Sequence, residues 1–320
     1  MGRRLRAITL MTLASAGMLM FHFTHRRSTT PRDLATTDLS GGSAPTVSAD
    51  AARGSNPLQP DVDSVPLEFF RNIKVDYVIT PKLAQRLPKP LSADFAVEMT
   101  GNVVIGAGGE LFEAETGASG LTVDRLAKVA PDSFAFDRWT TLLGITGRYF
   151  GQLEDDGAFS RAIPLPVEGM RLSSSANGGG VYLFGGNEYT NRRVYAISEE
   201  GQIAVIAEMP TEILAVTDSK DGIFVATGRD ILRITQTRGA ERVIRLPEDV
   251  GACVSIAVSP NGRTLFFSTV DRVYAMRGTT AFAIVRNLGG SSLCFQGRAL
   301  YIWNPTRAIL IRVADVESAL

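Results

Sequence analysis

Histidine is nearly absent from this chain of 320 residues: the two that occur, His22 and His25, lie close to the N-terminus. Their absence from the remainder excludes Ser-His-Asp and Cys-His nucleophile systems, histidine general bases, and zinc, copper or iron sites with histidine ligands. Any chemistry beyond His25 must therefore use carboxylates, amides, Lys, Arg, Tyr or hard metals.

Cysteine is equally scarce, with Cys253 and Cys294 as its two occurrences. They do not form a C-x-x-C pair, which excludes haem attachment and thiol redox motifs. They fall near the starts of two successive repeats described below. A disulfide between neighbouring inner strands and two small buried thiols are therefore both compatible with the sequence.

An excess of one charge is also missing, because 33 basic residues balance 33 acidic ones. A chain with zero net charge lacks the basic footprint that nucleic acids and anionic surfaces require. We therefore expect no nucleic-acid partner.

A long uncharged segment is present near the N-terminus, over residues 7–23, with Arg3, Arg4 and Arg6 before it and Arg26 and Arg27 after it. We predict that residues 1–27 form an uncleaved membrane anchor through 7–23, or a signal peptide cleaved after Ala14-Ser15-Ala16. The surplus of positive charge before the segment places the body in the periplasm or extracellular space, and cleavage would release it. Residues 28–68, largely small and polar, are predicted to be a disordered linker.

A unit of about 40 residues recurs six times after Ser92, and a period of this length with several short strands per unit is typical of a β-propeller. The copies begin near Ala93, Asp132, Gly169, Thr211, Gly251 and Gly290. The sequence thus predicts an all-β, six-bladed propeller over residues 69–320. A seventh blade starting at Phe69 is the alternative.

The last copy lacks its outer strand, and an unpaired edge is a liability in a ring. Two earlier segments could supply the strand: residues 75–79, which alternate polar and apolar side chains, and residues 82–88, which resemble the outer strand at 242–247. Either would close the ring.

Three motifs resemble six-bladed propellers of the NHL-repeat and gluconolactonase-like superfamily: Arg193-Val194-Tyr195, Asp271-Arg272-Val273-Tyr274, and the turn at residues 259–266. The resemblance implies an axial calcium ion held by Glu, Asn and Asp, and a hydrolase of esters or lactones. The position of the family's asparagine ligand falls on Val254 here, and valine cannot coordinate calcium.

Loops between the second and third strands of a propeller lie on one face, and here they carry arginine in five successive copies. A ring of guanidinium groups around an axial mouth would attract an anion, whereas each arginine could instead pack over its own blade. The longest of these loops, residues 185–191, is expected to set specificity through Asn187 and Glu188. The predicted ligand-binding arginines are Arg148, Arg193, Arg229, Arg272 and Arg307.

Three carboxylates, Glu98, Asp137 and Asp218, lie on or near first strands and are the candidates for a metal site or an acid/base pair; capping a turn is the alternative role. No catalytic residue is assigned. The sequence favours a non-catalytic binding or scaffold module for a protein or anionic ligand, with a calcium-dependent lactonase or esterase as the alternative.

Overall fold

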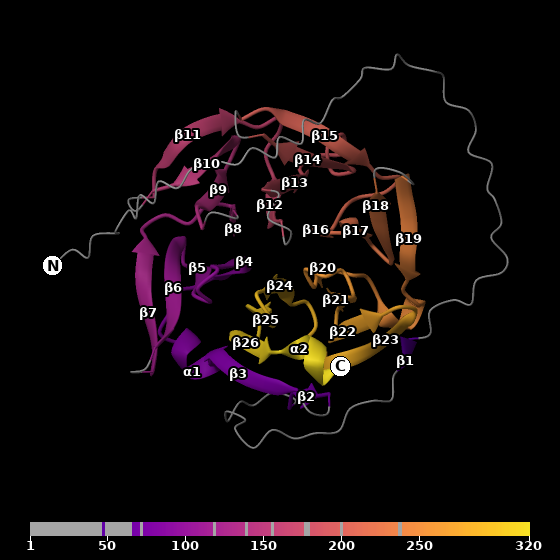
Figure 1. Ribbon diagram of the computed structural model, residues 1–320. Coiled ribbons are helices and arrows are strands. Elements are labelled where there is room, and N and C mark those ends of the chain that lie inside the picture. The colour runs from indigo at the N-terminus through magenta and orange to yellow at the C-terminus, as the bar shows by residue number, and fades with distance from the viewer. Residues whose placement is uncertain are drawn as a thin grey trace, which may run out of the picture. The chain divides into compact units, whose positions relative to one another are not determined.

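The computed structural model describes residues 47–48, 66–70, 73–117, 120–137, 140–154, 157–175, 180–198, 201–235 and 239–320. Within these residues six sheets surround a common axis, and the first strand of each sheet lies innermost (Figure 1). The predicted six-bladed propeller is confirmed.

Each blade is an antiparallel meander in which β-branched and aromatic residues dominate the strands, as a pleated and largely buried surface favours. Blade 1 contains β4 (Leu91–Val97), β5 (Val103–Ala107), β6 (Glu110–Gly117) and β7 (Gly120–Ala127). Blade 2 contains β8 (Ser133–Phe136), β9 (Leu142–Thr146), β10 (Tyr149–Leu153) and β11 (Phe159–Pro164). Blade 3 contains β12 (Met170–Ser174), β13 (Val181–Gly185), β14 (Arg193–Ile197) and β15 (Ile203–Glu208).

The second half of the ring repeats this order. Blade 4 contains β16 (Ala215–Ser219), β17 (Gly222–Thr227), β18 (Asp230–Thr235) and β19 (Gly239–Arg245), followed by a 3-10 turn, Glu248–Val250. Blade 5 contains β20 (Ser255–Val258), β21 (Thr264–Ser268), β22 (Arg272–Arg277) and β23 (Thr280–Arg286). Blade 6 contains β24 (Ser292–Gln296), β25 (Ala299–Asn304) and β26 (Ile309–Ala314), and helix α2 (Val316–Ala319) follows it.

Glycine forms the tight turn between β16 and β17. Gly222 adopts a φ of +133°, which side chains rarely tolerate, and a Cβ there would collide with the carbonyl oxygen of Ile234. Asp221-Gly222, a pair typical of tight hairpin turns, therefore forms the turn of this hairpin.

Strand β3 (Lys74–Ile79) supplies the fourth strand of blade 6 by pairing with β26. The ring is thus closed by the earlier of the two candidate segments, and Phe69 does not begin a seventh blade. The alternative, residues 82–88, was wrong, because this segment begins in helix α1 (Pro81–Ala84). Thr80 caps that helix through a bond from the Leu83 N–H, and Pro81 is pre-organised for the first turn.

The chain before β3 also contacts the propeller. β1 (Val47–Ser48) and β2 (Glu68–Phe69) both pair with β23, at the outer edge of blade 5. The predicted membrane or signal segment at 1–27 and most of the predicted linker at 28–68 lie outside the described residues. Among the helices in the described part of the chain, none is long and apolar enough to cross a membrane.

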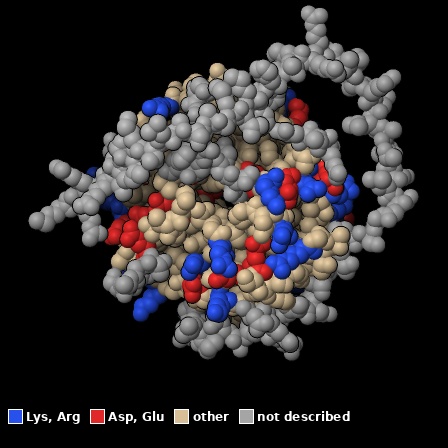
Figure 2. Space-filling model, in the orientation of Figure 1, with Lys and Arg blue, Asp and Glu red and all other residues tan. Residues whose placement is uncertain are grey.

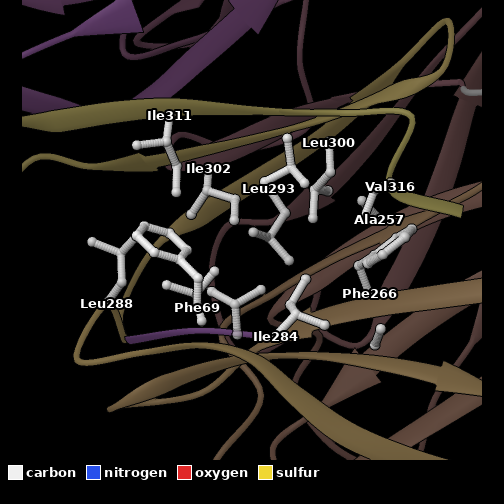
Figure 3. Close-up of a cluster of buried hydrophobic side chains, with 14 of the residues drawn as sticks. Phe69, Ala257, Phe266, Ile284, Leu288, Leu293, Leu300, Ile302, Ile311 and Val316 are labelled. Atoms are coloured by element: carbon white, nitrogen blue, oxygen red, sulfur yellow. The ribbon is translucent and has the colours of Figure 1, made fainter. Parts of the chain in front are cut away.

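The hydrophobic core lies between neighbouring blades, and its largest cluster joins blades 5 and 6 (Figure 3). Phe266 stacks on Phe295 there, at 5.6 Å between ring centroids, and Phe69 of β2 packs into the same cluster. At the junction of blades 6 and 1 the fully buried Trp303 donates its indole N–H to the Ser92 carbonyl at 2.8 Å. These contacts hold blade 6 between blades 5 and 1.

Candidate functional site

An axial pocket of about 480 Å³ is lined by the inner strands of all six blades. It reaches the turns between first and second strands, through Met99, Pro260 and Gly297. The loops between second and third strands lie at the other end of each blade, because consecutive turns of a meander alternate between its two ends. The lining also includes Phe184, Leu214 and Val254 at that second end, so the pocket extends along the axis between both ends, but none of the five predicted arginines belongs to it.

Arg171 and Asp94 form an ion pair within this pocket. Arg171, on β12 of blade 3, donates from a terminal guanidinium nitrogen to Asp94 Oδ1, on β4 of blade 1, at 3.2 Å. The guanidinium carbon also lies 5.5 Å from the ring centroid of Phe184, the cross-strand neighbour of Arg171 on β13. The pair bridges two non-adjacent blades and holds the guanidinium group of Arg171 near the axis.

Serine side chains link the inner strands to one another. Ser133 and Ser255 accept bonds at 3.0 Å from the backbone N–H groups of Leu172 and Leu293 on the following blades. Ser173 donates to the Val216 carbonyl at 2.5 Å, and Ser292 donates to the Ala93 carbonyl at 2.7 Å. These bonds satisfy backbone groups that lie where blades meet and fix the width of the pocket.

Asp218 is buried, with 5% of its surface exposed, and its carboxylate accepts bonds from Ser175 Oγ at 2.6 Å and Tyr182 Oη at 3.0 Å. Burial, together with the negative charge of Asp218, raises the pKa of Tyr182 far above its usual value of 10. The tyrosine therefore remains a neutral hydrogen-bond donor at physiological pH. The cluster ties β16 to the neighbouring blade.

The other two predicted carboxylates cap turns. Glu98 accepts a bond from Thr100 Oγ1 at 2.6 Å, and Asp137 accepts one from the Thr141 N–H at 2.8 Å. Both turns join a first strand to a second, and Asp137 also lines the pocket. The structure does not bring Glu98, Asp137 and Asp218 together as one group: within the described residues, no three His, Cys, Asp or Glu side chains are placed to hold a metal.

The pocket does not fit calcium, which takes six to eight oxygen ligands. Asp94 and Asp137 are the carboxylates on its described lining; the first is ion-paired and the second caps a turn. Val254, at the position of the superfamily's asparagine ligand, lines the pocket without offering a side-chain oxygen. We therefore derive no chemical step through a metal.

The five predicted arginines lie at the turns between second and third strands, as their sequence positions indicate, and none lines the pocket. Arg193, Arg229 and Arg272 pair with Glu208, Glu248 and Asp271, at 3.2, 3.0 and 2.8 Å. Arg148 donates to the Pro166 carbonyl at 3.2 Å, and Arg307 donates to the Asn287 carbonyl. Each thus has an acceptor on its own blade or on a segment that joins its blade to a neighbour, and anion binding by the five stays a prediction.

The loop at 185–191 is shaped by Asn187, whose side-chain oxygen accepts a bond from the Tyr189 N–H at 3.0 Å. Asn187 and Glu188 are exposed, and Tyr189 exposes 74% of its surface. The Asn187 side chain therefore stabilises the loop, and Tyr189 is the most exposed aromatic residue of the loop. A specificity role for Asn187 and Glu188 stays a prediction.

Cys253 and Cys294 are free thiols and form no disulfide with each other. Burial raises the pKa of each to about 12. At neutral pH both are protonated and act as small apolar groups.

Charges of both signs are interspersed on the face that carries α2 (Figure 2). Arg298 and Asp315 pair there at 2.8 Å, and Glu317 of α2 accepts bonds from Asn261 and Thr264 at the β20–β21 turn. Among the described residues of this face, the two signs are mixed and present no field of one sign to a partner.

Sequence reasoning missed Arg171 and Asp94, although both stand on first strands, where inward-facing charge is unusual. A search for ionisable residues on every innermost strand would have selected them.

No protein-family model matches the chain, and no curated protein matches it. Solved structures do. A structure described as a gluconolactonase covers 77% of this chain and 93% of its own, at 12% identity and a TM-score of 0.52. Virginiamycin B lyase from Staphylococcus aureus covers 76% of this chain and 99% of its own, at 14% identity and a TM-score of 0.49. The fold that this chain shares with the first is the six-bladed propeller, which the sequence also predicted.

Proposed function

We propose that this protein is a non-catalytic binding module that takes a small organic molecule into its axial pocket. The observation that carries the proposal is the composition of the lining. Phenylalanines from several blades line it together with a comparable share of polar groups, including Arg171, Ser174, Thr217 and Gln296. A cavity of several hundred Å³ that combines aromatic walls with oriented polar groups has the features of a small-molecule site.

The arrangement of the acidic groups favours binding over hydrolysis. Asp94 is ion-paired, Asp137 caps a turn, and Asp218 accepts two side-chain bonds. A general base needs a carboxylate within reach of the proton it removes. The calcium-dependent hydrolase stays the alternative, and stoichiometric calcium in the purified protein, together with metal-dependent turnover of lactones, would favour it over our proposal.

The test is a ligand-observed NMR screen of the full chain with a set of neutral and charged fragments. Ser174→Trp should fill the pocket and abolish binding of the fragments found, because Ser174 lines it and its side chain makes no hydrogen bond within the described residues. Thr122→Trp, on the exposed outer strand β7, is the control and should change nothing. Fragments that bind equally to wild type and Ser174→Trp would contradict the proposal.

We further propose that the body works outside the cytoplasm, held to the membrane through residues 7–23 or released after cleavage. The support is the uncharged segment and the arginines before it. Cell fractionation with N-terminal sequencing of the mature protein decides between the two forms. Recovery of the intact chain from the cytoplasm would contradict both.

A further inference from the structure

The axial pocket contains a single basic side chain among its described lining residues, that of Arg171. This side chain is 48% exposed, whereas its partner Asp94 is 16% exposed. The guanidinium therefore presents part of its surface to the pocket, although Asp94 and the Phe184 ring fix its position.

The contact with Asp94 leaves donors of Arg171 available. A guanidinium has five N–H groups arranged as a fork, and the bond to Asp94 uses one terminal nitrogen. Within the described part of the chain, the guanidinium makes no other hydrogen bond. Its remaining edge matches the two oxygens of a carboxylate.

The surroundings of Arg171 restrict the rest of such a ligand. Phe95, Phe134, Phe136 and Phe295 line the pocket along with Phe184, so they would contact an apolar body. Asp94 and Asp137 outnumber the one arginine on the lining, so a second negative charge on the ligand would be repelled. A polyanion such as a phosphate ester is disfavoured for that reason.

We propose that the pocket binds a monocarboxylic acid with an aromatic or branched apolar body, and that Arg171 receives its carboxylate. The inference rests on the proposed function, since it names the ligand class of the same pocket. Asp94 is the positioning residue that fixes the guanidinium. No bond is made or broken in the process.

The experiment compares 3-phenylpropionate with its uncharged amide, 3-phenylpropanamide, by isothermal titration calorimetry on the full chain. The two probes have the same apolar body and differ in charge. We expect the acid to bind at least about tenfold more tightly, because a charge-assisted bidentate contact replaces a neutral one. Its affinity should fall as the salt concentration rises, and that of the amide should not.

Arg171→Gln should reduce the affinity of the acid to that of the amide and leave the amide unchanged. Arg171→Lys keeps the charge without the fork and should give an intermediate value; it also serves as the test if Arg171→Gln does not fold. Arg125→Gln, on the outer strand β7 and outside the pocket lining, removes the same charge and is the control; it should bind both probes as wild type does.

Equal affinities of acid and amide, or a preference for the acid that survives in Arg171→Gln, would overturn the inference. If Ser174→Trp still abolished the binding of both probes, the proposed function would stand while the ligand class was wrong. If neither probe bound and the fragment screen found no pocket ligand, both would fail.

Discussion

At the scale of single residues, polar groups near the axis are stabilised by partners from neighbouring strands. Asp218 illustrates this, because a buried carboxylate is tolerated only when its oxygens accept hydrogen bonds. Ser175 and Tyr182 supply those bonds from blade 3 and thereby connect it to blade 4. A polar contact of this kind fixes which blade faces meet, which apolar packing alone specifies less strictly.

Tyr182→Phe should therefore destabilise the fold. It removes a donor from a buried carboxylate, and we expect the free energy of unfolding to fall by about 1–3 kcal/mol in urea titrations. Tyr149→Phe, at a tyrosine that is 56% exposed, is the matched control and should stay within about 0.5 kcal/mol of wild type. Equal losses in the two variants would show that the Asp218 contact contributes nothing.

The thiols of Cys253 and Cys294 should make the free energy of unfolding depend on pH in the alkaline range. Their pKa is raised from 9 to about 12 in the folded protein, so the unfolded chain loses its protons first as the pH rises. The contribution of the thiols to the free energy of unfolding is fully present well below pH 9. It should then decline towards pH 12, by about 1 kcal/mol per pH unit for each thiol. Urea unfolding at pH 8, 9 and 10 in reducing buffer measures the decline.

Cys253→Ala combined with Cys294→Ala should make this profile shallower between pH 9 and 10; the decline that remains belongs to the tyrosines whose pKa burial also raises above 10, Tyr77, Tyr182, Tyr274 and Tyr301. The slope is the diagnostic quantity, because the double variant also changes packing at every pH. A slope as steep as that of wild type would contradict the assignment to the thiols.

At the scale of elements, the sequence predicted strands well where the local pattern is strong. The first strands of blades 1, 2 and 3 begin at Leu91, Ser133 and Met170, close to the predicted repeat starts at Ala93, Asp132 and Gly169. The strand that closes the ring was harder to predict, since residues 75–79 and 82–88 both carry strand-like patterns. The structure selects the first because Pro81 favours a helix start and offers no N–H to a ladder, a preference that the pattern of residues 82–88 does not reveal.

Ile79→Ala tests this closure. Ile79 is fully buried and packs in the cluster that joins blades 6 and 1, so its truncation should cost about 2–5 kcal/mol in urea unfolding. Lys74→Ala, on an exposed position of the same strand, is the control and should change stability little. An Ile79→Ala variant as stable as the control would mean that β3 contributes little to ring closure.

At the scale of the whole molecule, the candidate site could be predicted only in part. The five arginines occupy the expected turns because a turn position is set by local sequence. The pairing of Arg171 with Asp94 joins residues 77 positions apart, on blades that are not neighbours. Only closure of the ring brings them together, and no spacing or motif in the chain encodes that distance. The axial ion pair is therefore a property of the assembled propeller.

The last prediction concerns the arginine face, the end of the propeller where the loops between second and third strands carry Arg148, Arg193, Arg229, Arg272 and Arg307. It concerns binding that does not depend on the pocket. If the guanidinium groups of the loop face act on a shared anionic partner, Arg229→Gln combined with Arg272→Gln should weaken binding of a hexaglutamate peptide, and wild-type binding should weaken with salt. The melting temperature should hardly change, because the pairs with Glu248 and Asp271 are partly exposed and each contributes about 0–1 kcal/mol.

The matched control for that experiment is Arg298→Gln combined with Arg312→Gln. Both arginines also form exposed ion pairs, with Asp315 and Asp76, but Arg298 lies in the turn between β24 and β25 and Arg312 lies on strand β26, so neither belongs to the loops between second and third strands. The control therefore removes the same charge without touching that face, and it should bind the peptide as wild type does. Equal weakening in both double variants would mean that net charge, not the loop face, attracts the peptide. Unchanged binding in the variant that lacks Arg229 and Arg272 would contradict the prediction. It would mean that these two arginines only form local ion pairs.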